Sequence, residues 1–297
     1  MKKNSIVFIL IVIFCLSGIS FAEETIKIGV LAKRGAVKAM SKWKLTGEFL
    51  TKSLPGKKFE IIPLGFNKVY PAIEGNDIDF FLVNSSMFIT AKVKFGAKAI
   101  VTMINSRQGK PLTSFGGVIL TLAENDTINT LSDLKGKTFM AVKASSFGGW
   151  QMAYKELLDA GINPYRDFSK LEFGNKHDNV ILAVQNETVD AGTVRTDTLE
   201  RMASAEMIDL DEFKIIHQKK YSDFPFKCST SLYPEWPLAK TVQTSDQLAE
   251  QVAAALKGLK AEHPAAKTAK IVGWMDPLDY TPVESLQQLL NIGAYEN

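Results

Sequence analysis

The most restrictive feature of the sequence is an alternation of short apolar segments with helical segments, linked by brief turns. Residues 26–31, 59–64, 79–83 and 99–104 are apolar runs of strand length. The segment 37–54 has the apolar spacing of an amphipathic helix, and short helices are expected after the second and third runs. Because strand and helix alternate with short links, the sequence predicts a parallel sheet covered by helices. Such sheets bind ligands beyond the carboxyl ends of their strands.

The middle of the chain repeats this alternation around two polar turns. Residues 116–123 form another apolar strand, and the later segment 188–193 forms a further short one. Between them, Ser145 and Ser146 precede one helical segment and His177 begins another. The first backbone N–H groups of a helix lack partners and carry partial positive charge, so two converging helix N-termini can hold an oxyanion. We therefore expect half of an anion site at these turns.

The C-terminal part of the chain is expected to return to the first sheet. The segment 221–237 is rich in proline, hydroxylic and aromatic residues, as suits a loop that crosses back. Three helical segments are expected after it, at 247–259, 264–272 and 283–290. The predicted plan is one lobe of residues 23–112 with 225–297, and an inserted second lobe of residues 113–224. A cleft would lie between the two lobes.

The N-terminus has the pattern of a secretion leader. Lys2 and Lys3 precede an apolar run over residues 6–16, and small residues stand before a cleavage position after Ala22. The run is short for a membrane-spanning helix, although an uncleaved anchor is the alternative. The pattern predicts a periplasmic protein, exported with residues 1–22 removed.

Composition and charge exclude several classes of function. An apolar content of 46% and a charged content of 23% are those of a globular protein with enough material for a core. Loss of two of the 35 basic residues with the leader leaves 33 against 32 acidic ones, a net charge of +1, which offers nucleic acid no basic surface. Cys228 is the only cysteine outside the leader, so neither an internal disulfide nor a cysteine-based metal site is expected. The sequence contains no cofactor motif or catalytic signature, and we expect no cofactor, no metal and no enzymatic activity.

Short motifs of one protein family follow one another along the chain. They are GVL at 29–31, LSDLKGK at 131–137, SSFG at 145–148, HD at 177–178, AV at 183–184 and VDAG at 189–192. In these motifs the sequence resembles the phosphate, phosphite and phosphonate substrate-binding proteins of ABC transporters. A second set resembles the subgroup that serves as extracytoplasmic sensor domains of bacterial histidine kinases: LAKRG at 31–35, TVRTDTLE at 193–200, SLYPEW at 231–236 and DYTPV at 279–283.

The resemblance implies a fold, a ligand and a partner. The fold would be the type 2 periplasmic-binding-protein fold, an α/β architecture whose two lobes are joined by two crossing segments. A small anion of the phosphonate, phosphate or phosphite type would lie in the cleft, held by Ser145, Ser146 and His177. Lobe closure would present this ligand to the membrane permease of an ABC transporter, and the protein would be a monomer. The alternative is a sensing or interaction module that signals to a membrane sensor kinase without transport.

Other candidate ligand-binding residues follow from side-chain chemistry. Arg195 can form bidentate bonds to an oxyanion, and an ion pair with an acid is its alternative use. The remaining candidates are polar or basic residues near strand ends, namely Thr193, Thr196, Tyr70, Asn84, Ser85, Lys33 and Arg34. Core packing, helix capping and a solvated turn are the ordinary alternatives for the aromatic, polar and basic members of this set. An enzyme on this fold would need a nucleophile, and Cys228 is the one thiol candidate.

Overall fold

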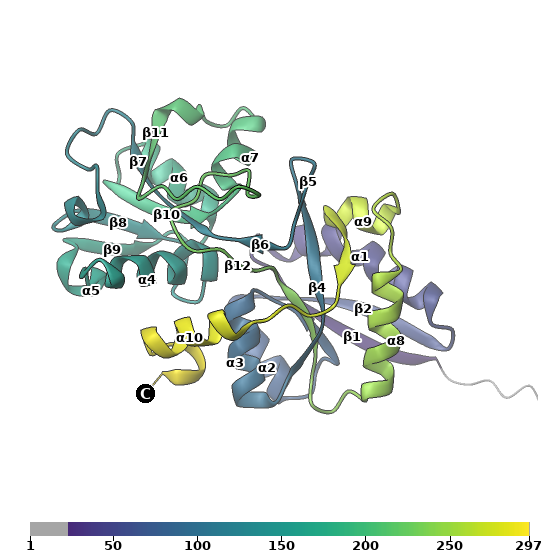
Figure 1. Ribbon diagram of the computed structural model, residues 1–297. Coiled ribbons are helices and arrows are strands. Elements are labelled where there is room, and N and C mark those ends of the chain that lie inside the picture. The colour runs from purple at the N-terminus through teal and green to yellow at the C-terminus, as the bar shows by residue number, and fades with distance from the viewer. Residues whose placement is uncertain (1–22, 297) are drawn as a thin grey trace, which may run out of the picture.

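The computed structural model describes residues 23–296. Two separate β-sheets, each flanked by helices, lie on either side of a short two-stranded ribbon (Figure 1). The leader predicted at residues 1–22 lies outside the described residues. Within the described part of the chain, no helix is both long enough and apolar enough to cross a lipid bilayer.

The first sheet has seven strands and is built from both ends of the described chain. Its first three strands, β1 (Glu24–Leu31), β2 (Lys57–Leu64) and β3 (Phe80–Leu82), are parallel, because helices form the links between them. Antiparallel strands complete the sheet, namely β4 (Lys98–Arg107), β5 (Lys110–Leu112), β13 (Pro237–Lys240) and β14 (Ile271–Met275). The strand order is β14-β4-β13-β3-β1-β2, with β5 paired to β4.

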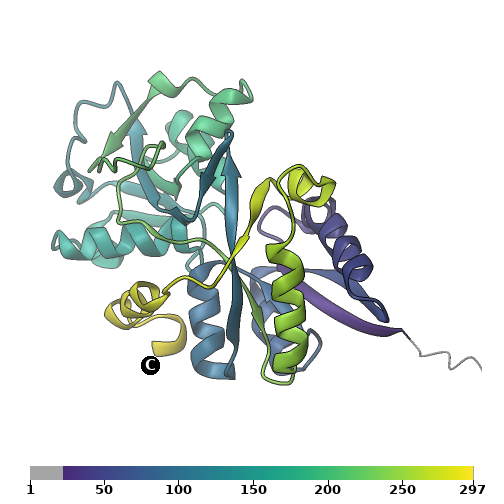
Figure 2. The ribbon, with the colours of Figure 1, turned by 45° about the vertical axis from the view of Figure 1, so that its right-hand side comes forward.

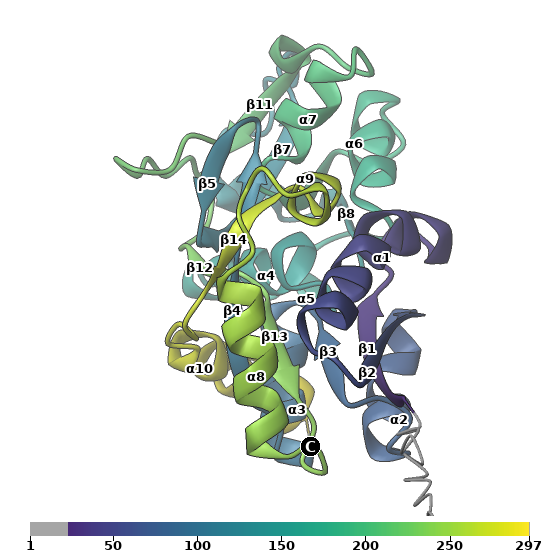
Figure 3. The same ribbon diagram turned by 90° about the vertical axis from the view of Figure 1, so that its right-hand side faces the viewer.

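Helices cover both faces of the first sheet because each buries one apolar stripe. In α1 (Ala36–Ser53), the buried residues recur at three- and four-residue intervals from Ala39 through Trp43 to Leu50. The helices that share its face are α8 (Asp246–Lys257) and α9 (Pro264–Ala269), and the opposite face carries α2 (Val69–Glu74) and α3 (Ser85–Phe95) (Figure 3). The last helix, α10 (Thr281–Leu290), packs against α3 and also against the second lobe.

The second sheet has five strands with an apolar cluster on each face. Its strands are β7 (Gly117–Leu122), β8 (Thr138–Ala141), β9 (Lys170–Phe173), β10 (Ala191–Arg195) and β11 (Phe213–Ile216), in the order β11-β7-β10-β8-β9. The helices are α4 (Met152–Asp159), α5 (Pro164–Asp167), α6 (His177–Gln185) and α7 (Thr198–Ser204). Val118 and Leu120 pack with residues of α6 and α7, whereas Ile119 between them packs with residues of α4. A strand buried on both faces reads as a continuous apolar run, as residues 116–123 do.

Two crossing segments join the lobes as a small antiparallel ribbon (Figure 2). These segments are β6 (Ser114–Phe115) and β12 (Tyr233–Pro234). The chain returning toward β12 lies very close to the chain leaving β6, because a Cβ on Gly116 would lie 2.6 Å from the sulfur of Cys228. Only glycine leaves room for this approach, so the two crossings are packed as one unit.

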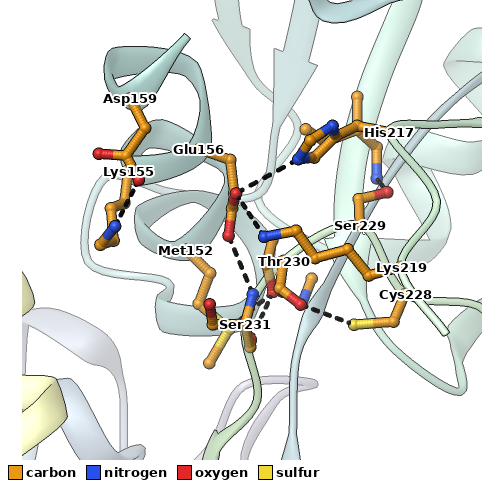
Figure 4. A network of polar contacts seen from close by, with 12 residues as sticks. Met152, Lys155, Glu156, Asp159, His217, Lys219, Cys228, Ser229, Thr230 and Ser231 are labelled. Atoms are coloured by element: carbon orange, nitrogen blue, oxygen red, sulfur yellow. Dashed lines mark hydrogen bonds and ion pairs between the residues drawn. The ribbon is translucent and has the colours of Figure 1, made fainter. Parts of the chain in front are cut away.

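A buried carboxylate anchors the returning segment to the second lobe (Figure 4). Glu156 of α4 accepts hydrogen bonds from the backbone N–H of Ser231 at 2.9 Å and from the Lys219 ammonium at 2.8 Å. The Nε2 atom of His217 lies 3.5 Å from the same carboxylate. Glu156 therefore ties the end of the crossing segment to a helix of the second lobe.

The observed elements agree with most of the segments expected from the pattern, with one clear error near the C-terminus. The helix expected over residues 264–272 ends at Ala269, and the strand β14 begins at Ile271. Lys270 adopts a left-handed conformation with φ 52°, which stops the helix and turns the chain into the sheet. The strand expected at residues 188–193 runs instead from Ala191 to Arg195.

Candidate functional site

The candidate site lies between the lobes, where strand ends from both sheets face each other. In the first lobe, Lys33 follows β1 and Asn84 follows β3. In the second lobe, Ser146 follows β8, His177 follows β9, and Arg195 is the last residue of β10. These five side chains line one narrow pocket with Leu31, Phe66, Phe115, Phe147, Gly148 and Trp236. Residues that were separate candidates in the sequence thus lie around one pocket. Their contact with a ligand stays a prediction.

His177 is held as a neutral imidazole with one ring nitrogen already bonded. It begins α6, and its Nδ1 accepts a hydrogen bond from the backbone N–H of Arg195 at 3.1 Å. Burial lowers the pKa of His177 well below its usual value, and the charges of Lys33 and Arg195 lower it further. A neutral imidazole whose Nδ1 is an acceptor carries its proton on Nε2. His177 therefore offers an Nε2–H donor.

Ser146 precedes a π-helical turn, Phe147–Gln151, that leads into α4. Its side chain makes no capping hydrogen bond, so the hydroxyl is not used to close the turn. Gly149 permits this arrangement, because a Cβ there would lie 2.5 Å from the side chain of Val142 and 2.7 Å from the Ser146 hydroxyl. The Ser146 hydroxyl and the first N–H groups of the turn are therefore donors at the pocket.

Arg195 forms the ion pair that was the alternative to direct ligand binding. Its guanidinium pairs with the carboxylate of Glu235, and both side chains are buried. Although burial opposes the charge of Glu235, Arg195 lowers the pKa of this carboxyl, and Asn105 donates to it at 2.8 Å. The guanidinium also lies 4.0 Å from the ring centre of Phe115. Arg195 thus lines the pocket with a guanidinium that is held in place and already paired with an acid.

A wider, strongly basic pocket of about 280 Å³ adjoins the narrow one. The two share the side chains of Lys33, His177 and Arg195. The basic residues that line the wider pocket are Lys33, Arg34, Lys38, Lys42, Arg107, Arg195, Arg201 and Lys270, and the acidic ones are Asp178 and Asp197. Eight basic side chains against two acidic ones produce a positive potential that favours anions.

The two acids connect the lobes across the cleft. Asp178 of α6 lies 2.7 Å from the guanidinium of Arg34 in the first lobe, and it also pairs with Arg201 in its own lobe. Asp197 of the second lobe lies 3.2 Å from the guanidinium of Arg107 at the end of β4. These ion pairs hold the two lobes in contact beside the basic pocket.

The four lysines of the cleft, Lys33, Lys38, Lys42 and Lys270, form no ion pair with any carboxylate that the structure describes, and two of them, Lys33 and Lys42, are partly buried. The Lys33 ammonium lies over the ring of Trp236, and the Lys42 ammonium lies over the ring of Trp43, each at 4.9 Å. Burial lowers the pKa of Lys33 well below its usual value, helped by the charge of Arg195. Burial, helped by Arg107, lowers the pKa of Lys42 to about 7. An anion that enters the cleft would favour the charged form of both lysines, because it would stand beside them as the partner they lack.

Five other predicted residues lie away from these pockets, whereas Arg34 lines the basic one. Ser145 and Tyr70 line a separate hollow of about 400 Å³ beside the C-terminal segment. The hydroxyl of Ser85 donates to a carbonyl of the crossing strand β12 at 2.6 Å. Thr196 accepts from a backbone N–H just before β7 at 3.2 Å, and Thr193 is wholly buried. Ser85 and Thr196 thus hold the crossing region together in this structure.

Sequence reasoning missed several residues of the cleft, among them Lys38, Lys42, Arg107 and Trp236. A signal existed for the first two, because Lys38 and Lys42 are four residues apart within a helix and so lie on the same side of it. Arg107 and Trp236 reach the cleft from β4 and from the end of the second crossing. Their place in the cleft depends on packing between segments that are distant in the sequence, which local patterns do not show.

The described residues give no support to metal or nucleophilic chemistry. Within residues 23–296, no three His, Cys, Asp or Glu side chains are placed to hold a metal ion. Cys228 is fully buried, its thiol donates to the carbonyl of Thr230 at 3.2 Å, and burial raises its pKa (Figure 4). A buried thiol with a raised pKa is a poor nucleophile.

Comparison with known proteins identifies the family. A model of the periplasmic substrate-binding proteins of phosphonate ABC transporters matches residues 28–283. The tetrathionate sensor histidine kinase TtrS of Salmonella typhimurium is 30% identical over 262 residues, which are 88% of this chain and 43% of that protein. The chain therefore spans less than half the length of this curated relative.

Solved structures show the same fold at low identity. PhnD1 of Prochlorococcus marinus, in complex with methylphosphonate, has a TM-score of 0.72 and 16% identity, and the match covers 91% of this chain and 99% of that one. A binding protein component of a phosphonate ABC transporter from Pseudomonas aeruginosa has a TM-score of 0.70 and 15% identity, over 90% and 86% of the two chains. These matches confirm the predicted α/β type 2 periplasmic-binding fold. The chain belongs to the family of extracytoplasmic substrate-binding proteins of phosphonate ABC transporters.

Proposed function

We propose that this protein binds a small oxyanion-bearing ligand in the cleft between its lobes. The observation that carries the proposal is the basic pocket, in which eight basic side chains face two acidic ones. Without an anion, the basic side chains of this pocket destabilise the protein, because like charges repel one another and burial weakens their hydration. A bound anion would reduce the repulsion and replace part of the lost hydration.

The narrow pocket supplies donors for one oxyanion group. The Nε2–H of His177, the hydroxyl of Ser146 and the first N–H groups of the turn after it come from the second lobe. Lys33 brings an ammonium from the first lobe to the same pocket. Donors from both lobes around one anion would favour the closed arrangement of the lobes, since the anion binds to both at once.

The chemistry of the relatives supports an oxyanion without fixing its identity. PhnD1 was solved with methylphosphonate, and the curated relative is named as a sensor of tetrathionate. Phosphonate and tetrathionate both present negatively charged oxygen atoms on a tetrahedral centre. The ligand class we propose for this chain is accordingly the phosphonate, phosphate or phosphite type, with sulfur oxyanions included in the test.

The ligand would be passed by the monomeric, exported protein to the membrane permease of an ABC transporter. Membership of the transporter family supports this partner. The second candidate is delivery of a signal to a membrane sensor kinase, favoured by the 30% identity to a sensor histidine kinase. Deletion of this protein separates the two, because loss of ligand uptake supports the permease and loss of ligand-dependent kinase output supports the sensor.

A thermal-shift screen tests the binding proposal. Phosphate, phosphite, methylphosphonate, sulfate, thiosulfate and tetrathionate would each be added to the purified protein, with tetramethylammonium as a cationic control. At least one anion should raise the unfolding temperature, and Ser146→Ala should reduce that rise. Ser222→Ala is the matched control, because Ser222 lies in an exposed loop. A screen in which no anion stabilises the protein would contradict the proposal.

A further inference from the structure

The narrow pocket and the basic pocket are connected by a third hollow with mainly apolar walls. These walls include Leu31, Trp43, Met103 and Trp236. The hollow shares Leu31, Lys33, Arg195 and Trp236 with the narrow pocket, but His177 and Ser146 do not line it. A ligand seated at His177 can therefore extend past Trp236 into a region with different lining residues.

This third hollow contains polar groups that no described residue satisfies. The indole Nε1–H of Trp236 is buried and makes no hydrogen bond. The ammonium of Lys42 pairs with no described carboxylate, and it lines the third hollow but not the narrow pocket. A donor or a cation held away from water without a partner is destabilising. Both groups would be satisfied by an anionic group brought by a ligand.

The ion pairs of the cleft show which of its basic side chains already have an acidic partner and which could pair with a ligand. Its arginines have acidic neighbours, since Arg195 pairs with Glu235, Arg107 lies beside Asp197, and Arg34 and Arg201 share Asp178. The four lysines of the cleft form no ion pair with a described acid; Lys38 and Lys270 are exposed to water, whereas Lys33 and Lys42 are partly buried. Lys33 borders the narrow pocket, and Lys42 borders only the other two hollows. One partly buried lysine without an ion pair is thus present for each end of an extended ligand.

We propose that the cleft binds a compact dianion, with one oxyanion group at His177 and a second anionic group beside Lys42. This inference rests on the proposed function, because the first group occupies the oxyanion pocket described above. The spacer between the two groups would be short and weakly polar, since it passes the apolar walls formed by Leu31 and Trp236. The ligand class is therefore a small two-headed anion rather than a simple phosphonate with a neutral tail.

Two phosphonates of equal carbon number test this inference. Propylphosphonate carries one anionic head, whereas 3-phosphonopropionate adds a carboxylate at the other end of its chain. Calorimetric titration would be run in bis-tris buffer at about pH 6, below the pKa of about 7 at which Lys42 loses its proton. The wild-type protein should bind 3-phosphonopropionate at least about tenfold more tightly, as one charge-assisted hydrogen bond would give.

Lys42→Met should remove this preference and leave the affinity for propylphosphonate within about twofold of wild type. The matched control is Lys44→Met, which removes the same charge from an exposed position of the same helix, outside the cleft; it should keep the preference. Equal affinity for the two phosphonates in the wild type would overturn the inference, as would an unchanged preference in Lys42→Met. Binding of methylphosphonate but of neither longer compound would also overturn it. Absence of binding by all three would overturn the inference too, whereas the proposed function is overturned only if no anion of the thermal-shift screen stabilises the protein.

Discussion

The Nδ1 atom of His177 accepts a hydrogen bond from the backbone N–H of Arg195, with the two nitrogens 3.1 Å apart. This contact joins the first residue of α6 to the last residue of β10. It fixes the imidazole tautomer, so that the ring presents Nε2–H. A half-buried imidazole of lowered pKa can thus donate to an anion without carrying a charge of its own.

Amide substitutions at His177 separate the roles of its two nitrogens. Asparagine can imitate the Nδ1 acceptor for Arg195 but provides no donor at the Nε2 position, whereas the longer glutamine brings an amide N–H toward that position. We expect His177→Asn to weaken oxyanion binding by about 1.5–3 kcal/mol, the worth of a hydrogen bond to a charged group. His177→Gln should lose less binding free energy than His177→Asn. Titration calorimetry measures both, and equal losses in the two variants would argue against an Nε2–H donor.

The buried pair of Arg195 and Glu235 should matter more for stability than for binding. Glu235→Gln leaves a buried guanidinium with only the more distant Asp197, at 3.5 Å, to compensate it. Breaking such a pair typically costs about 3–5 kcal/mol, and the remaining acid places the expected loss near the lower end, at about 3 kcal/mol. Urea denaturation gives the change in the free energy of unfolding. The double variant Glu235→Gln with Arg195→Met should recover part of the loss, and no recovery would contradict the pairing argument.

Lys42 should make the stability of the ligand-free protein depend on pH. Its pKa is about 7 in the folded protein, against 10.5 as the ordinary value, which the unfolded chain keeps. Between these values the unfolded chain binds more protons, so raising the pH stabilises the folded form across this window. The gain from about pH 7 to about pH 9 in denaturant unfolding should be smaller in Lys42→Met than in the wild type. The same slope in both proteins would show that Lys42 has an ordinary pKa.

Glu156 should stabilise the crossing segment through its contact with Ser231 (Figure 4). Glu156→Gln keeps the shape and one acceptor oxygen but removes the charge that faces Lys219. We expect a loss of about 1–3 kcal/mol in unfolding free energy, because a buried charge-assisted contact is weakened. Hydrogen exchange should show faster exchange of the Ser231 amide. Lys155→Met, on the same helix but paired with Asp159 rather than with Glu156, is the control and should leave that amide unchanged.

Local patterns predicted the elements well because each segment carries its own periodicity. The parallel strands β1 to β3, the helix α6 beginning at His177 and the doubly buried strand β7 all follow from spacing within a few residues. The pattern predicts a helix that extends into the first two residues of β14, since alanines and a lysine precede the strand without any breaker. Its identity as a strand depends on pairing with β4, far away in the sequence.

The site was only partly predictable, for a similar reason. Polar residues at strand ends could be read directly, and Ser146, His177, Lys33, Asn84 and Arg195 do share a pocket. The role of Trp236 and Arg107 could not be read, because it arises from packing between segments more than a hundred residues apart. Likewise, the sequence shows that Arg195 is basic but not that a glutamate 40 residues later neutralises it.

The central claim is that the cleft binds an oxyanion through a donor on His177. Isothermal titration of the wild-type protein and His177→Ala with the anion that stabilises the protein most in the thermal-shift screen tests it most directly. The account predicts a saturable site with one anion per chain, and a loss of at least about tenfold in affinity when His177 is replaced. Equal affinity in the two proteins, or no saturable binding in the wild type, would contradict it.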